Sequence, residues 1–124
     1  MGRRGRHRGR AGRLAAPDRS YRDADGNELV LRGSLSARTR TAYAGIASGS
    51  SLPAGASRED AWHRAVEFLF EHVAVSWTIA GAPALTRQSE LVGRLRLAST
   101  AERAWVRERL REHCAAHFPD LEAP

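Results

Sequence analysis

The sequence predicts an α+β fold, in which an N-terminal β-hairpin is followed by three or four α-helices and preceded by a disordered, Arg/Gly-rich arm. A turn-forming segment, DADGN, separates two short stretches that have the character of strands. Farther along the chain, apolar residues recur every three or four positions, as they do on one side of a helix. The 124 residues suffice for one domain of ordinary size. We therefore expect residues 1–19 to form the arm and residues 20–124 to form a single small domain.

The arm accounts for the whole excess of positive charge. The chain has 20 basic residues, all of them arginine, and 14 acidic residues. Six of the arginines lie in the arm: Arg3, Arg4, Arg6, Arg8, Arg10 and Arg13. Without these six the two signs balance, so the sequence assigns the basicity to the arm and not to a domain surface. The six could contact nucleic-acid phosphates, although no aromatic residue lies among them for base stacking.

The hairpin is predicted over residues 20–35. Its turn segment, DADGN, offers Asp and Asn side chains as acceptors, and Gly26 can adopt a positive φ. The same segment resembles the start of a calcium-binding loop in its alternate acidic residues. However, Glu28 stands where that loop needs glycine, and Ser34 stands where it needs a bidentate carboxylate. We therefore expect a plain turn and no bound calcium.

Three shorter segments are predicted to be helices because a capping residue precedes each of them. Ser36 precedes a helix at residues 37–47, and Thr86 precedes a helix that continues through RQSELVGRLRLA. The pattern STAE at residues 99–102 is a capping box for the last helix, from Thr100 to about His117.

The longest helix is expected from Arg58 to about Trp77, after a pattern at Ser57 and Asp60 that resembles a capping box. One apolar line on it contains Trp62, Val66, Leu69, Val73 and Trp77, with Phe70 at its edge. A second line, spaced by seven, contains Ala61, Phe68 and Val75. A helix that is apolar on two sides is usually packed between other elements. Either those elements cover both lines, or a surface of Phe68, Val75 and Phe70 binds another chain.

No catalytic motif is found, and we predict neither an enzyme nor a cofactor. His113 and His117 lie one helical turn apart, a spacing that also suits a metal ion. The favoured interpretation places both histidines beside the core at a helix end, where the positive form suits the helix dipole. Cys114 has no recognisable base near it in the sequence and is interpreted as a small core residue.

The composition also predicts where the protein acts. No apolar run is long enough to cross a bilayer. A single cysteine excludes a disulfide within the chain and fits a reducing compartment. We expect a cytoplasmic protein without a membrane partner.

Residues 21–97 resemble the tail assembly chaperones of long-tailed phages, particularly phages of actinobacterial hosts. The matching segments are DADGNELVLRGSLSARTR, EDAWHRAVEFLFEHVAVSW and TIAGAPALT. The resemblance implies a non-enzymatic protein of the host cytoplasm that shields apolar helices of the tape-measure protein while the tail assembles. It also implies self-association.

Two other functions remain open at this point. The chain could be a small nucleic-acid-associated protein that acts through its arginine arm. It could also be a structural virion component, such as a head–tail connector. Both would have a similar composition.

Overall fold

The computed structural model describes residues 17–49, 55, 57–121 and 123–124. In chain order, the described elements are β1 (Arg19–Arg22), β2 (Glu28–Leu31), α2 (Ala37–Ala47), α3 (Arg58–Val73), β3 (Ala74–Thr78), α4 (Gln88–Arg96) and α5 (Thr100–His117). The α+β class is confirmed, with an N-terminal hairpin and four helices. The six arginines of the arm lie outside the described residues. Arg19, which the sequence assigned to the arm, is the first residue of β1 and pairs with Leu31.

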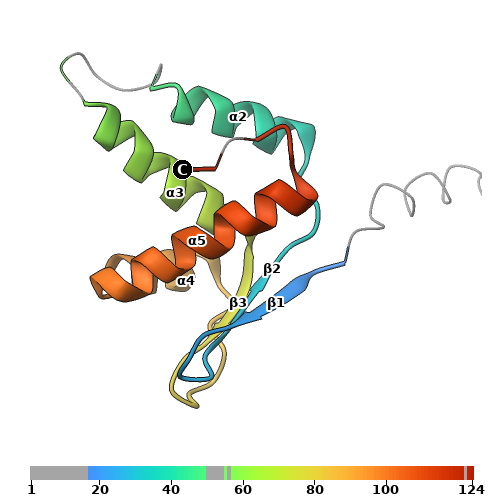
Figure 1. Ribbon diagram of the computed structural model, residues 1–124, viewed down its shortest axis with the longest axis vertical. Coiled ribbons are helices and arrows are strands. Elements are labelled where there is room, and N and C mark those ends of the chain that lie inside the picture. The colour runs from blue at the N-terminus through green and yellow to red at the C-terminus, as the bar shows by residue number, and fades with distance from the viewer. Residues whose placement is uncertain (1–16, 50–54, 56, 122) are drawn as a thin grey trace, which may run out of the picture.

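The sheet has three antiparallel strands in the order β1-β2-β3. Tyr21, Leu29 and Trp77 occupy one row across it, because Tyr21 pairs with Leu29 and Leu29 pairs with Trp77. All three side chains are buried. Helix α3 leads directly into β3, and residues 32–36 connect β2 to α2 (Figure 1). The sheet therefore contributes this row to the core, together with Leu31 of β2 and Ala74 of β3.

The third strand corrects the prediction of one helix from Arg58 to Trp77. The helix ends at Val73, and Ala74 is already extended, with φ −71° and ψ 128°. Residues 74–78, AVSWT, are rich in β-branched and aromatic residues, which favour strands. These residues pair with β2, on the side of that strand that β1 does not occupy. Trp77 is buried as expected, but it reaches the core from the sheet.

The capping predictions hold for three helices and fail for a fourth. Both capping boxes form, with Ser57 and Asp60 at the start of α3 and Ser99 with its partner at the start of α5. Ser36 caps α2 as predicted. Thr86 does not cap α4, which begins at Gln88 after an N-cap residue without a side-chain cap. The backbone of Leu85 exchanges two hydrogen bonds with Trp77, and this extended pairing delays the start of the helix.

One core joins the sheet to the four helices that the structure describes. From α3 it receives Ala65, Leu69, Phe70 and Val73, and from α5 it receives Val106, Leu110 and Cys114. Within the described residues, no helix is both long and apolar enough to cross a membrane.

Candidate functional site

His113 is a buried structural residue and not part of an open site. Its Nε2 lies 2.8 Å from the carbonyl oxygen of Arg32, and its Nδ1 lies 2.9 Å from the Tyr21 hydroxyl. Because a carbonyl only accepts hydrogen bonds, Nε2 carries the proton and donates it, and Nδ1 accepts from the hydroxyl. Burial lowers the pKa of His113, so the ring is neutral near pH 7. The expected positive histidine at a helix end is therefore wrong for His113.

These hydrogen bonds bear on the alternative of a metal at His113 and His117. The centroids of the two rings lie 4.4 Å apart, so the two histidines are neighbours one helical turn apart, as predicted. However, a metal could reach His113 only after the bond to Tyr21 or to Arg32 had broken. No cluster of three or more His, Cys, Asp or Glu side chains suited to a metal occurs within the described residues. His113 is bonded to the hairpin, and His117 lies against the rings of His113 and Phe118.

Two other side chains that could take part in chemistry, Cys114 and Asp23, are buried or hydrogen bonded. Burial raises the pKa of the Cys114 thiol to about 11, so the thiol stays protonated at neutral pH and is a poor nucleophile. The Asp23 carboxylate accepts hydrogen bonds from the backbone of Asp25 and from the backbone and side chain of Asn27. This pattern is that of a side-chain-stabilised turn, as the sequence predicted.

The predicted partner surface of Phe68, Val75 and Phe70 is not one surface. Phe70 is fully buried and contacts the Trp77 ring edge-on, so it is removed from any surface of the monomer. Val75 is half-buried and lies on β3, not on the helix. Phe68 is half-buried, stacked on His72 at 4.2 Å between ring centroids and 6.5 Å from the Tyr43 ring of α2. Packing by α2 and by the sheet therefore accounts for most of the second apolar line.

A groove between α2 and α3 is the candidate binding site. It has a volume of about 810 Å³ and is lined mainly by small side chains of the two helices, with two aromatic rings among them. The lining from the helices consists of Tyr43, Ala44, Ala47, Ser48, Arg58, Ala61, Trp62 and Ala65. The alanines keep the walls low, because a methyl group extends little from the helix backbone. Ala44 and Ala47 are exposed, whereas Ala61 and Ala65 form the buried floor.

The C-terminal segment borders this groove. It leaves the end of α5 and turns into the angle between α2 and α3 (Figure 1). Leu121 and Ala123 contribute to the lining, and Leu121 is buried. The Arg40 guanidinium of α2 pairs with the Asp120 carboxylate at 3.2 Å and lies over the Phe118 ring. The groove thus has an apolar interior and a charged rim.

Sequence reasoning missed this groove. It assigned Trp62 to the core line of the long helix, but Trp62 is half-buried and lines the groove. The available signal was the spacing of alanines on both helices, Ala44 and Ala47 on one and Ala61 and Ala65 on the other. Alanine is common in helices, so that spacing indicates a groove only once the two helices are known to be neighbours.

The chain matches no model of a protein family, no curated protein and no solved structure with significance. Its function is therefore inferred from its fold, its groove and its charged surfaces.

Proposed function

We propose that this protein is a non-enzymatic protein-binding factor that receives an apolar helix of a partner in the α2–α3 groove. The observation that carries the proposal is the alanine-lined wall of that groove, with Ala44 and Ala47 exposed beside Tyr43 and Trp62. Small side chains let a third helix approach to the interaxial distances of packed helices, about 8–10 Å. Trp62 is half-buried at the groove, and tryptophan is enriched among the anchors of protein interfaces.

The state of the reactive side chains supports binding over catalysis. His113 has both ring nitrogens in hydrogen bonds, and the Cys114 thiol is buried with a raised pKa. Neither of them faces the groove lining. A general base or a nucleophile would have to lie within reach of a bound substrate. The groove offers apolar contact and a polar rim instead.

The resemblance to tail assembly chaperones suggests which partner this is. We propose that the protein acts in the cytoplasm of a phage-infected cell and shields an apolar helix of the tape-measure protein. A groove that accepts one helix suits such a role, because an unassembled helical protein exposes apolar stripes that would otherwise aggregate. Self-association, which the resemblance also implies, stays a prediction for light scattering of the purified chain.

The experiment uses two matched substitutions on α2. Ala44→Glu places a carboxylate in the groove wall, whereas Ala42→Glu places the same group on an exposed position of α2 outside the groove. A tape-measure segment co-expressed with each variant, and then titrated by calorimetry, reports binding. We expect Ala44→Glu to weaken binding by about thirtyfold or more, the effect of a central interface residue, and Ala42→Glu to bind like the wild type.

Circular dichroism melting is the control for folding, and both variants should melt close to the wild type because both sites are exposed. Equal binding by the two variants would show that the partner does not use the groove. Failure of the wild-type chain to bind any tape-measure segment would reject the chaperone role itself.

A further inference from the structure

Helix α5 carries most of its arginines in one line. Beyond the arm, acidic and basic residues balance in number, but on this helix one of the four arginines, Arg109, pairs with glutamates and the other three lie in a line of their own. Arg103, Arg107 and Arg111 follow one another at intervals of four residues, so they form one stripe along the helix. We call these three residues the arginine stripe.

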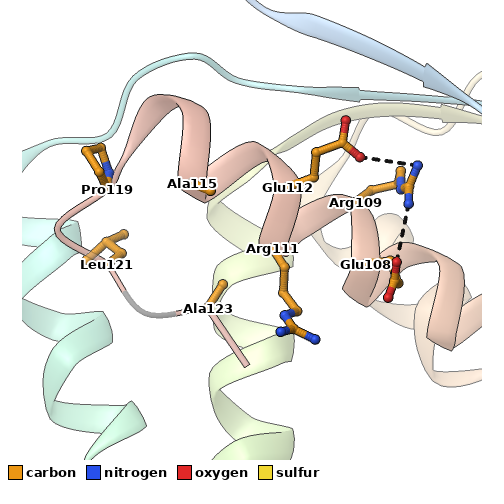
Figure 2. A pocket seen from close by; sticks show the side chains of 8 residues that line it. All are labelled: Glu108, Arg109, Arg111, Glu112, Ala115, Pro119, Leu121 and Ala123. Carbon is orange, nitrogen blue, oxygen red and sulfur yellow. Dashed lines mark ion pairs between the residues drawn. The ribbon is translucent and has the colours of Figure 1, made fainter.

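The acidic residues of α5 pair with other arginines. Glu108 and Glu112 lie 3.5 Å and 3.3 Å from Arg109, which is outside the stripe. Figure 2 shows Arg109 joined to both carboxylates, while Arg111 extends from the helix away from them. Glu102 pairs with Arg94 of α4 at 2.7 Å. The acids that could neutralise the stripe are thus drawn to other partners.

Two of the stripe arginines are held in place by contacts that do not neutralise their charge. The Arg107 guanidinium lies over the Trp62 ring, 4.4 Å from its centroid, and Arg103 donates a hydrogen bond to the backbone carbonyl of Arg96. Within the part of the chain that the structure describes, none of the three stripe arginines forms an ion pair. The result is a row of three unpaired positive charges, two of them on exposed side chains.

We infer that the arginine stripe binds the phosphate backbone of a nucleic acid. Three arginines at four-residue intervals span about 12 Å along a helix, which equals the rise of about three to four nucleotides in one strand of B-form DNA. Guanidinium groups suit phosphates because they can donate two parallel hydrogen bonds. Arg107 already covers a face of Trp62, so the contact is to the backbone and depends on charge, not on base sequence.

A nucleic acid fits the stripe better than an acidic protein does. The face of the Trp62 ring toward the stripe is covered by the Arg107 guanidinium, so the stripe itself presents charge and no apolar surface to a partner. Phosphate binding needs only aligned cations. The six arginines of the arm add charge of the same sign for the same polyanion. This inference does not rest on the groove or on the proposed partner of the groove.

The test uses the full chain and two double variants with the same change in net charge. Arg103→Gln/Arg111→Gln removes the two exposed stripe residues and leaves the Arg107 contact with Trp62 in place. Arg38→Gln/Arg87→Gln is the matched control, because both of these arginines are exposed, lie outside the stripe and form no ion pair among the residues that the structure describes. Fluorescence anisotropy measures binding to labelled single-stranded and duplex DNA of about 20 nucleotides, at several salt concentrations.

We expect the stripe variant to bind duplex DNA about 10- to 100-fold more weakly near 0.1 M salt, and the slope of log K against log salt to fall in magnitude by about two. The control should stay within about twofold of the wild type. Comparison of the two DNA probes shows which form of backbone the stripe prefers. Unchanged melting of both variants confirms that the fold is intact.

Three outcomes would overturn the inference. The first is that both double variants bind DNA equally, which would assign binding to the arm or to charge in general. The second is that the wild-type chain binds neither DNA probe. The third is that a labelled oligoglutamate peptide binds the wild-type chain more tightly than DNA does and loses affinity in the stripe variant, which would indicate an acidic protein partner.

Discussion

The contact between α5 and the hairpin differs from the groove between α2 and α3 in almost every physical respect. At the hairpin contact, the His113 ring is fully buried and both of its nitrogens are bonded, one to Tyr21 and one to the backbone of Arg32. In the groove, Ala44 and Ala47 are exposed. The first region is closed by specific hydrogen bonds and large side chains, and the second is left open by small ones.

The difference separates stability from binding. A buried polar group whose partner is removed destabilises the fold, because the group left behind has no water to replace the lost bond. An exposed alanine on a helix has no such dependence, so a change there affects mainly what the surface can bind. We therefore expect substitutions in the core and at the hairpin contact to lower stability, and substitutions in the groove wall to leave stability nearly unchanged.

The largest loss of stability is expected for Leu69→Ala. Leu69 is 1% exposed on the core side of α3, and removing its side chain leaves a cavity. The free energy of unfolding should fall by about 2–5 kcal/mol, which urea denaturation followed by circular dichroism would measure. A decrease below about 1 kcal/mol would mean that neighbouring side chains fill the cavity and that Leu69 is not central to the core.

The second loss is expected at the hairpin contact. His113→Leu introduces an apolar side chain of similar size and leaves the Tyr21 hydroxyl and the Arg32 carbonyl without their partner. The expected cost is on the order of 2 kcal/mol, since each orphaned buried group costs about 1–3 kcal/mol and local relaxation recovers part of it. Tyr21→Phe is the control, because it removes only one hydrogen bond and should cost about 1 kcal/mol. Equal effects of the two substitutions would mean that the bond to Arg32 contributes little.

The same residue predicts a dependence on pH. The pKa of His113 is lowered in the folded protein because burial disfavours its charged form. Below the ordinary value of 6.5, the unfolded chain binds a proton at this residue before the folded chain does. Stability should therefore be fully present above pH 6.5 and decline as the pH falls from 6.5 toward the lowered pKa. Thermal melting between pH 8 and pH 5, in about half-unit steps, should show a steeper loss for the wild type than for His113→Leu. Parallel curves would contradict a neutral, buried His113.

Local signals in the sequence predicted the hairpin and the starts of α2, α3 and α5. The DADGN turn and the two capping boxes depend on residues within four positions of each other, so they can be recognised without knowledge of the fold. The third strand could not be found in this way. The interval of four residues between Val73 and Trp77 continues a helical pattern, while the pairing that makes AVSWT a strand is with β2, more than 40 residues earlier.

The site shows the same limit more strongly. His113 and Tyr21 are separated by 92 positions in the chain, and only the folded sheet brings them into hydrogen-bonding distance. The groove needs the α2 and α3 alanines to face each other across two helices. Phe70 was assigned to a partner surface because a helical wheel gives the direction of a side chain but not what lies in that direction. Tertiary packing supplied that information.

The smallest change is expected at the rim of the groove, for Asp120→Asn. Arg40 Nη1 lies 3.2 Å and 3.3 Å from the two Asp120 oxygens, but the two side chains are 35% and 57% exposed. Water and salt screen an ion pair of this kind, so its loss should cost less than about 1 kcal/mol. The loss should shrink further in about 1 M NaCl, where the Debye length is near 3 Å.

Leu121→Ala provides the matched comparison in the same C-terminal segment. The Leu121 side chain is 9% exposed and packs in the core, so its truncation should cost about 2 kcal/mol or more. Urea denaturation of the two variants at low and high salt would separate the contributions. If Asp120→Asn proved as costly as Leu121→Ala, and if salt removed that cost, the ion pair with Arg40 would be what holds the C-terminal segment against α2. Apolar burial of Leu121 predicts the opposite order, with an effect that salt does not diminish.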